Sequence, residues 1–300
     1  MGNSKIKTIV FPVGGFGTRF LPATKATPKE MLPVAEKPLI QYAFEEAMQA
    51  GIEKFIFVTG RNKNSIEDHF DNAFELQKVL SEKKKEELLK KTIGWLPKAG
   101  HIVFLRQQEP LGLGHAILCA EKFVGNEPFI VSLADEMVYE EDNYLQKMIK
   151  LAEEKNANVL GIAEIDKKNT KKYGVVDTNG KNDDVVEIFD MVEKPEPEDA
   201  PSNLSNIGRY ILSPKIFEYI KKTEPTINSE VQLTDAMKIM LKEEDKEKFF
   251  GLKFKGNRFD CGSVLGYLEA NLHYSLNNPK IRNDVVSIID KFYKKVRNEN

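Results

Sequence analysis

A strand that runs directly into a glycine-rich turn constrains the fold of this chain more than any other feature. Residues 6–13 are β-branched and mostly apolar, which is typical of a buried strand in a parallel sheet. In the turn that follows, Gly14, Gly15 and Gly17 let bare backbone N–H groups approach a ligand. Ligands of open α/β sheets bind at the carboxyl ends of the strands. The sequence therefore predicts an α/β protein with a ligand site beside this turn.

Predicted strands and helices alternate through the first half of the chain. Apolar residues at helical spacing predict a helix between Pro38 and Gly51, and an apolar strand follows at residues 54–59. Residues 64–91 have the pattern of a helix with a solvated, mixed-charge face. Further strands are expected at residues 101–105, 128–134 and 158–165, and further helices at residues 114–123 and 143–155.

The pattern changes after about residue 170. Residues 173–177 and 185–192 are expected to be strands on either side of an Asn179-Gly180 turn. Further strands are expected at residues 208–212 and 249–254, and helices at residues 214–222, 231–242 and 262–276. We therefore predict a doubly wound, mixed but mostly parallel sheet with antiparallel additions and C-terminal helices.

The last helix is set apart from the rest of the chain. We expect one domain over residues 1–280 and a helical tail over residues 281–300. In the tail, apolar side chains on or near one face could cover either the body of the same chain or a partner subunit: Val285, Ile288, Ile289, Phe292 and Val296.

The composition excludes several classes of protein. Lys and Arg number 44 against 46 Asp and Glu, so the chain lacks the basic excess of a dedicated nucleic-acid binder. No apolar stretch approaches the roughly 18 residues of a membrane span, and no targeting segment is visible, so we expect a cytoplasmic protein without membrane contact. Cys119 and Cys261 are too few for a disulfide framework or a four-cysteine zinc site, and we expect reduced thiols.

The glycine-rich turn does not match either common phosphate-binding motif. The P-loop needs Gly-Lys-Ser or Gly-Lys-Thr, which is absent, and the dinucleotide motif needs a third glycine where Phe20 stands. Three cations follow in a proline-rich loop, namely Arg19, Lys25 and Lys29, and they suit a triphosphate. A structural turn followed by solvated surface charges is the alternative.

Carboxylates stand at two further strand ends. Asp135 ends an apolar strand, and Asp260 lies between a strand and a helix, so each is a candidate ligand of Mg²⁺. Helix N-capping is the alternative role of each. Glu193 and Lys194 leave another strand and could contact sugar hydroxyls and a phosphate, although such a pair is also common in loops.

Residues 14–33, GGFGTRFLPATKATPKEMLP, resemble the nucleotide-binding signature of the bacterial UTP–glucose-1-phosphate uridylyltransferases, also called UDP-glucose pyrophosphorylases. The resemblance spans about residues 5–275, and further matching blocks include residues 112–116 (GLGHA), 133–135 (LAD), 192–195 (VEKP) and 260–262 (DCG). One departure is Leu111, which stands where members usually carry a basic or small residue. This departure puts in doubt a charged contact from that position.

The resemblance implies a glycosyltransferase-A-like nucleotidyltransferase fold and a Mg²⁺-dependent transfer of the uridylyl group of UTP to glucose 1-phosphate. It implies that the triphosphate is held by Gly14, Gly15, Gly17, Thr18, Arg19 and Lys29. It assigns Glu30, Gln107 and Gly112 to the uracil and its surroundings, and Gly174, Glu193 and Lys194 to glucose 1-phosphate. It assigns Asp135 and Asp260 to Mg²⁺, and it implies a homodimer or homotetramer.

The chemistry of this reaction agrees with the residues present. A sugar 1-phosphate has a second pKa near ~6, so its oxygen is already an anionic nucleophile and no catalytic base is needed. We expect Arg19, Lys29 and Lys194 to offset the repulsion between the two phosphate compounds. The alternatives are a transferase of the same fold with dTTP or another sugar 1-phosphate, and a non-catalytic sensor of sugar nucleotides. An NAD-dependent enzyme is disfavoured by Phe20.

Overall fold

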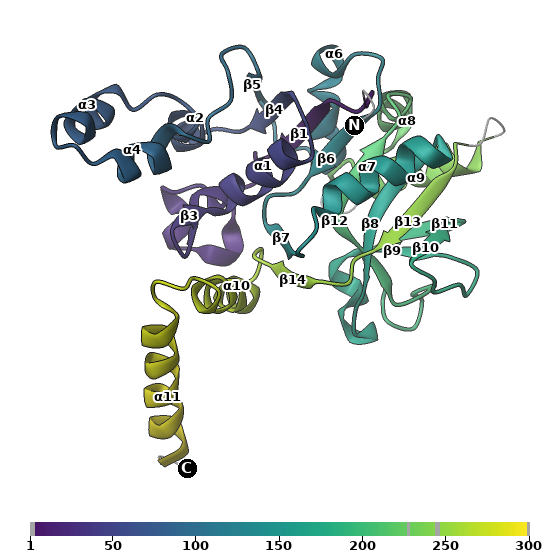
Figure 1. Ribbon diagram of the computed structural model, residues 1–300. Helices are drawn as coiled ribbons and strands as arrows, with labels where there is room; N and C mark the ends of the chain where they lie inside the picture. The colour runs from purple at the N-terminus through teal and green to yellow at the C-terminus, as the bar shows by residue number, and fades with distance from the viewer. Residues whose placement is uncertain (1–3, 227–228, 244–246, 299–300) are drawn as a thin grey trace.

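A mixed sheet forms the centre of the molecule in the computed structural model, which describes residues 4–226, 229–243 and 247–298 (Figure 1). Its main strand order is β10-β13-β8-β12-β6-β1-β4-β5. The bounds of these strands are β1 Thr8–Pro12, β4 Lys54–Thr59, β5 Ile102–Arg106, β6 Phe129–Ser132, β8 Asn158–Glu164, β10 Val185–Glu187, β12 Leu204–Leu212 and β13 Phe249–Lys253.

Parallel pairing dominates the half of the sheet that carries the glycine-rich turn. Strand β1 is parallel to β4 and to β6, and β4 is parallel to β5. Strand β12 runs antiparallel between β6 and β8, and β13 is parallel to β8. The prediction of a mixed, mostly parallel sheet is confirmed. Because β1 and β6 are parallel, their carboxyl ends lie at one edge and bring the turn and Asp135 to the same side.

Helices cover both faces of the sheet. Helices α1 (Leu39–Gln49) and α7 (Tyr144–Lys155) pack on one face, and α5 (Leu113–Leu118), α8 (Ile216–Lys222) and α9 (Leu233–Lys242) pack on the other. Strand β1 alternates between the two layers, with Val10 in one hydrophobic cluster and Ile9 and Phe11 in the other. This arrangement confirms the doubly wound prediction.

The predicted helix over residues 64–91 is wrong. The structure has three helices there, α2 (Asn64–His69), α3 (Phe74–Glu82) and α4 (Glu86–Ile93). The first break follows from the Asp71 side chain, which accepts the Asn72 N–H at 2.7 Å and so competes with the helix. The second break contains Lys84, whose φ is 54°. The predicted helix over residues 114–123 is likewise divided into α5 and α6 (Glu121–Val124).

The Asn179-Gly180 turn forms as predicted, with φ values of 52° and 77°. The strand expected after it is divided at Ile188 and Phe189. The Ile188 N–H donates to the Phe249 carbonyl and the Phe189 N–H donates to the Asp177 carbonyl, so the two halves join different strands. Strand β10 pairs with β13, whereas β11 (Asp190–Glu193) pairs antiparallel with β9 (Gly174–Asp177).

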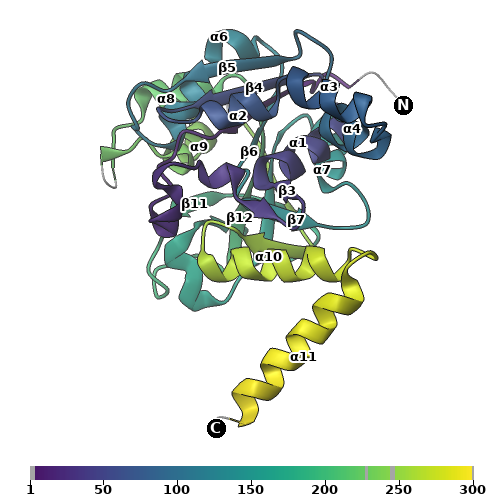
Figure 2. The same ribbon diagram turned by 90° about the vertical axis from the view of Figure 1, so that its left-hand side faces the viewer.

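Two short strands that contribute to the site were not predicted from the sequence. Strands β7 (Glu136–Tyr139) and β14 (Asn257–Asp260) form a separate antiparallel ladder, in which Asp260 is opposite Glu136. A second small ladder joins β2 (Pro33–Val34) to β3 (Lys37–Pro38). The chain ends with α10 (Val264–Leu276) and α11 (Arg282–Asn298), and α11 extends away from the body (Figure 2). No helix within the described residues has the length and apolar character needed to cross a bilayer.

Candidate active site

The turn after β1 packs closely against the end of β4, and one of its glycines has a left-handed backbone. A β-carbon at Gly60 would lie 2.8 Å from the Gly14 carbonyl oxygen, so the ends of β1 and β4 meet backbone to backbone. Gly17 has a left-handed φ of 64°, and its carbonyl oxygen accepts the Thr24 hydroxyl at 2.7 Å. Thr18 begins the 3₁₀ turn Thr18–Phe20. These contacts fix the conformation of the loop and keep its backbone close to the carboxyl edge of the sheet.

The structure brings together three of the residues assigned to the nucleotide. The Gln107 side-chain oxygen lies 3.1 Å from the place that a β-carbon at Gly14 would take. The Gln107 amide nitrogen donates to the Gly112 carbonyl at 3.1 Å. Gly112 has a φ of 96° and packs against Val231, whose N–H donates to the Leu111 carbonyl at 2.8 Å. The turn and the Gly112 loop thus share Gln107 as a bridge.

Glu30 lies in a different environment from Gln107. Its carboxylate is buried and ion-paired with Lys63, with Nζ and Oε2 2.8 Å apart. Burial raises the pKa of Glu30, although the neighbouring Lys29 and Lys63 act in the opposite direction. The second oxygen, Oε1, is buried without a hydrogen-bond partner among the described residues. Such an atom needs a donor, and a bound ligand could supply one.

Lys29 reaches from the loop to the end of β6. Its Nζ atom lies 2.5 Å from Oδ2 of Asp135. Burial by itself lowers the pKa of Lys29, but the carboxylates of Asp135 and Glu30 outweigh it and raise that pKa well above its usual value. Burial alone would raise the pKa of Asp135, but Lys29 outweighs it and lowers that pKa. Both groups are therefore charged at neutral pH.

Asp135, Asp260 and Arg19 converge on one glycine. The place that a β-carbon at Gly262 would take lies 2.9 Å from Oδ1 of Asp260, 3.2 Å from Oδ2 of Asp135 and 3.2 Å from Nη1 of Arg19. The β7–β14 ladder produces this meeting, because Asp260 is opposite Glu136 and the Cys261 N–H donates to the Asp135 carbonyl at 2.8 Å. The two predicted carboxylates, 125 positions apart in the chain, therefore face one small space.

These carboxylates fit a magnesium ion. Mg²⁺ commonly takes one or two carboxylates and completes its coordination with water and substrate phosphates. No group of three or more metal-ligating side chains occurs in residues 4–226, 229–243 and 247–298, so the protein part of such a site consists of this pair. Gly262 has no side chain and therefore leaves a space beside the two carboxylates. A side chain at this position would fill that space.

A network behind Asp260 was not found from the sequence. The Tyr173 hydroxyl donates to Oδ2 of Asp260 at 2.8 Å, and the Arg258 guanidinium lies 4.5 Å from the Tyr173 ring centroid. Arg258 in turn contacts both carboxylate oxygens of Glu136, at 2.9 and 3.0 Å. The pairing of β7 with β14 places Arg258 and Asp260 beside Glu136, and Tyr173 reaches them from the position just before β9.

The residues assigned to glucose 1-phosphate meet where β9 pairs with β11. Gly174 is opposite Glu193 in that ladder. Glu193 accepts the Thr234 hydroxyl at 2.7 Å through one oxygen and contacts Lys194 Nζ at 2.9 Å through the other. Lys194 has a φ of 48°, a left-handed conformation that costs a non-glycine residue about 1–2 kcal/mol. Strain of this kind is concentrated at functional sites.

One cavity of about 490 Å³ joins the sugar side to the carboxylates. A volume of this size is typical of a small-molecule site. Among the predicted site residues, it is lined by Arg19, Asp135, Gly174, Glu193, Lys194 and Asp260. The structure thus places six of the fourteen predicted site residues around one cavity, with Lys29 joined to it through Asp135.

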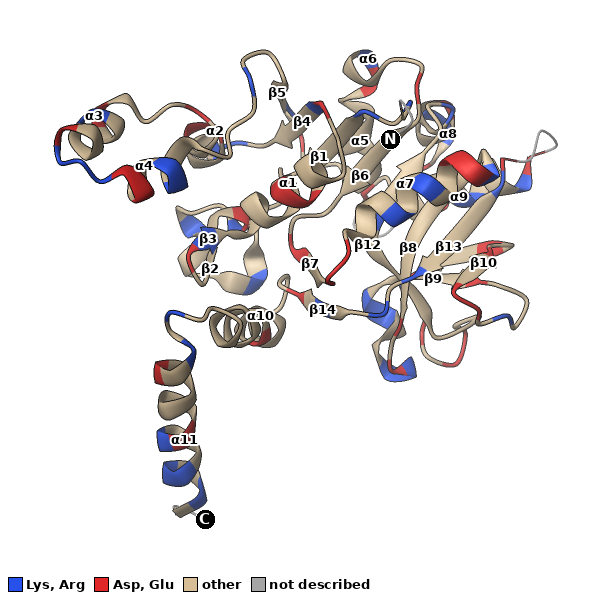
Figure 3. Ribbon diagram, in the orientation of Figure 1, with Lys and Arg blue, Asp and Glu red and all other residues tan. Residues whose placement is uncertain are grey.

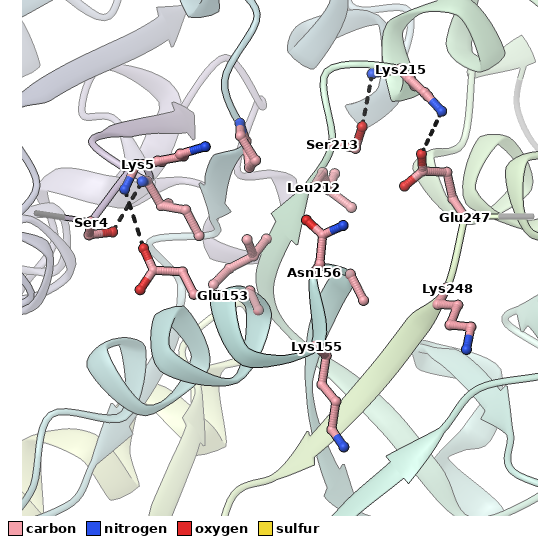
Figure 4. Close-up of a pocket in the computed structure, with 15 residues that line it drawn as sticks. Ser4, Lys5, Glu153, Lys155, Asn156, Leu212, Ser213, Lys215, Glu247 and Lys248 are labelled. Atoms are coloured by element: carbon pink, nitrogen blue, oxygen red, sulfur yellow. Dashed lines mark hydrogen bonds and ion pairs between the residues drawn. The ribbon is translucent and has the colours of Figure 1, made fainter. Parts of the chain in front are cut away.

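A larger cavity of about 1170 Å³ lies at the opposite end of the strands (Figure 4). Its lining includes Ile6, Pro128 and Ala157, which directly or closely precede β1, β6 and β8. In Figure 4 its carboxylates are already engaged, since Glu153 accepts the Lys5 N–H at 3.3 Å and Glu247 pairs with Lys215 at 2.8 Å. Because ligands of open α/β sheets bind at the carboxyl ends of the strands, we assign the site to the smaller cavity.

The family model described as Nucleotidyl transferase matches residues 8–276. The chain belongs to the nucleotidyl transferase family. This nucleotidyl transferase is 44% identical over 285 residues to a UTP–glucose-1-phosphate uridylyltransferase of Staphylococcus epidermidis, with 95% of this chain and 98% of the relative covered.

Solved structures agree with this membership. A UTP-bound UGPase from Acinetobacter baumannii is similar to this nucleotidyl transferase with a TM-score of 0.86 and 40% identity, over 95% of this chain and 98% of that one. A UDP-glucose pyrophosphorylase complexed with UDP-glucose gives a TM-score of 0.81 and 46% identity, over 90% and 98% of the two chains. The family and fold type predicted from residues 14–33 are confirmed.

Proposed function

We propose that this nucleotidyl transferase joins UTP and glucose 1-phosphate to give UDP-glucose and pyrophosphate. The observation that carries the proposal is the convergence of Arg19, Asp135 and Asp260 beside a cavity that Glu193 and Lys194 also line. A triphosphate needs cations beside bare amides, and a sugar phosphate needs a carboxylate for its hydroxyls and a cation for its phosphate. The names of the relatives support the same substrates.

The chain's own cations bring two repelling anions together. In the proposed complex, the backbone of residues 14–18 and the side chains of Arg19 and Lys29 hold the triphosphate, while Gln107 and Gly112 line the base. Glu193 accepts hydrogen bonds from the sugar, and Lys194 neutralises the sugar-side phosphate. Lys29 must then leave Asp135, to which it is bound at 2.5 Å, and turn to the triphosphate.

Asp135 and Asp260 would hold Mg²⁺ in this scheme. When bound, the ion would supply charge neutralisation for the nucleotide phosphates. The glycine at position 262 keeps the two carboxylates close, and Arg19 lies at the same point to contact phosphate oxygens.

The reaction is a direct displacement at phosphorus. An oxygen of the glucose 1-phosphate dianion forms a bond to the α-phosphorus of UTP. The bond from that phosphorus to the oxygen between the α- and β-phosphates breaks, and pyrophosphate leaves with that oxygen. No proton has to move, so the displacement needs no catalytic base. A chiral α-thio nucleotide should give inversion at phosphorus, and net retention would rule out a single displacement.

The decisive experiment measures pyrophosphate release from UTP and glucose 1-phosphate, with and without Mg²⁺. We expect turnover only with the metal, and only weak turnover with dTTP or other sugar 1-phosphates. Asp135→Asn should reduce the Mg²⁺-dependent rate by more than about 100-fold, since it removes a charged ligand. Asp142→Asn is the matched control, because this carboxylate is 81% exposed and outside the cavity. Equal rates for the two variants would contradict the metal assignment.

The proposal also covers the location of the protein, its oligomeric state and its division into domains. We place it in the cytoplasm, which agrees with two free thiols at Cys119 and Cys261, and we propose a homodimer or homotetramer. The division into a domain of residues 1–280 and a tail of residues 281–300 also stays a prediction.

A further inference from the structure

Arg209 on β12 is a buried charged side chain to which the proposed reaction gives no role. Only 2% of its surface is exposed, and arginine is rarely buried to this extent unless it is paired. Its partner is Glu46 on α1, which accepts from Nε at 3.1 Å and from Nη2 at 2.8 Å through the same oxygen. Helix α1 carries two acidic residues, Glu45 and Glu46, in one segment that is red in Figure 3. The remaining contacts of Arg209 show what this pair holds in place.

The third nitrogen of the Arg209 guanidinium holds the turn that carries Asp135. Its Nη1 atom donates to the Leu133 carbonyl at 3.2 Å and to the Glu136 carbonyl at 2.8 Å. These two carbonyls lie on either side of Asp135 in the chain. The turn itself is closed by the Glu136 N–H, which donates to the Leu133 carbonyl at 3.2 Å. Because the guanidinium is planar and its donors have a fixed geometry, Arg209 ties both ends of the turn to one rigid group.

Arg209 reaches this turn from the side that faces away from the site cavity. Asp135 lines the site cavity of about 490 Å³, whereas Arg209, Glu46 and Ala134 line a different cavity of about 240 Å³. Side chains alternate along a strand, and Gly208, which precedes Arg209 on β12, lines the site cavity. Arg209 therefore acts on Asp135 through the backbone of the turn and does not itself line the substrate site.

Gly208 supports the same turn with its backbone. Its carbonyl accepts the Leu133 N–H at 2.9 Å. Gly208 has a left-handed φ of 68°, and a β-carbon there would lie 2.9 Å from Cγ of Glu136. The turn thus lies directly on β12, with the backbone of one residue and the side chain of the next holding it.

The second oxygen of Glu46 indicates that the buried pair does more than add stability. This atom, Oε1, is buried and has no hydrogen-bond partner in the described parts of the chain, which is unfavourable. A buried ion pair often contributes no more to stability than apolar residues of similar volume. Apolar residues, however, would not supply the hydrogen bonds that Arg209 donates to the Leu133 and Glu136 carbonyls.

We propose that Arg209, oriented by Glu46, is a positioning residue that fixes the turn so that Asp135 stays beside Asp260. The inference rests on the proposed metal site. The reaction needs this support because Asp135 changes partners: Lys29 is bound to it here and turns to the triphosphate in the proposed complex. With its backbone held, the Asp135 carboxylate keeps its place when that ammonium leaves.

Arg209→Lys tests the proposal with two measurements that do not depend on turnover. Lysine keeps the charge but cannot reproduce the planar fork of donors. Amide hydrogen exchange in peptides covering residues 133–136 should become about tenfold faster or more, while peptides covering residues 54–59 of β4 should exchange as in the wild type. The dissociation constant of Mn²⁺, followed by electron paramagnetic resonance, should rise about fivefold or more, because the two carboxylates no longer meet at a fixed place. The Mg²⁺ concentration for half-maximal pyrophosphate release should rise in parallel.

Variants at Glu46 separate positioning from stability. Glu46→Gln should give a smaller change of the same kind, since it weakens the bond that orients Arg209. Glu45→Gln is the matched control on the next position of α1, where the carboxylate pairs with Lys37 at 2.6 Å, and it should alter neither measurement. The double variant Arg209→Met with Glu46→Leu leaves no uncompensated buried charge, so it should stay folded. It should nevertheless show the fast exchange at residues 133–136 and the weak Mn²⁺ binding, and it provides the test if Arg209→Lys does not fold.

The outcomes distinguish this proposal from the metal assignment on which it rests. If Asp135→Asn loses Mn²⁺ binding but the folded Arg209 variants keep it, the metal assignment stands and the positioning role is wrong. If Asp135→Asn binds Mn²⁺ like the wild type, the metal assignment is wrong and the positioning role is overturned with it. Faster exchange throughout the Arg209 variants, at residues 54–59 as much as at residues 133–136, would show that the pair stabilises the whole fold without a particular effect on the turn.

Discussion

Lys194 has two neighbours that explain its unusual backbone. Its N–H donates to the Tyr173 carbonyl at 3.1 Å and its ammonium contacts Glu193 at 2.9 Å, so the left-handed turn aims the side chain along the cavity. This geometry could not be predicted, because Glu-Lys-Pro leaves many sheets without such a turn. The residue itself was predicted from the resemblance, and its place on the cavity wall agrees with the assigned role.

Replacing Lys194 should separate the two substrates. Lys194→Ala should lower kcat/KM for glucose 1-phosphate by about 10- to 100-fold, which corresponds to the loss of a hydrogen bond to a charged group. The affinity for UTP should change far less. Steady-state kinetics with each substrate varied in turn provides the measurement. Lys168→Ala is the control, because its ammonium is exposed and paired with Asp166. Equal losses for both substrates would remove Lys194 from the sugar side.

Tyr173 is a positioning residue for Asp260. Tyr173→Phe keeps the ring under Arg258 but removes the 2.8 Å hydrogen bond to the carboxylate. We expect the Mg²⁺ concentration for half-maximal rate to rise several-fold, with kcat at saturating metal largely kept. Binding of Mn²⁺, followed by electron paramagnetic resonance, gives a readout apart from activity. Tyr219→Phe, which loses a hydrogen bond to Glu243 on the far helix pair, should alter neither quantity. A lower kcat with unchanged metal dependence would contradict this role.

At the scale of elements, the loop of residues 111–114 connects the two halves of the site. Gly112 faces Gln107 on one side and Val231 on the other, and a β-carbon there would meet the Glu230 side chain at 2.8 Å and the Val231 carbonyl oxygen at 2.9 Å. The segment before α9 therefore fixes the loop that we propose lines the base. The GLGHA block shows that a glycine is needed, but the sequence gives no sign of its partner at residues 230–231.

Gly112→Ala should disturb this connection. The left-handed φ of 96° costs about 1–2 kcal/mol for alanine, and the close contacts add to it. We expect the KM for UTP to rise by about tenfold or more. Gly100→Ala is the matched control. Gly100 also has a positive φ, of 87°, and apart from its chain neighbours no heavy atom lies within 4 Å of the position that a β-carbon would take. It therefore lacks the close contacts of Gly112. If both variants had the same KM for UTP, the contact with Val231 would be irrelevant.

Element prediction succeeded for the apolar buried strands and failed for the short strands β7 and β14 and for the breaks within residues 64–91. Strand β4 was predicted at its observed bounds because six residues of a buried strand give a clear pattern. Strands β7 and β14 have four residues each, and their pattern carries no such signal. The division of residues 64–91 depends on side-chain hydrogen bonds at Asp71, which periodicity does not register.

At the scale of the whole molecule, the sequence predicted candidate site residues but not how they meet. Asp135 and Asp260 were predicted as a pair from their places at strand ends and from the family signature. Their actual contact depends on the β7–β14 ladder and on Gly262, which hold them together across the fold. In the sequence, the predicted tail helix has apolar residues on or near one face. Only the structure shows that none of the described residues of α11 is buried.

The late position of β14 in the chain has a consequence for biosynthesis. The first carboxylate of the pair leaves the ribosome when less than half of the protein has been made, whereas its counterpart follows only near the end. Until then the nascent polypeptide carries a glycine turn and cations that can attract nucleotide, but its ion site is half built. The proposed ion site is therefore complete only when the chain is nearly finished.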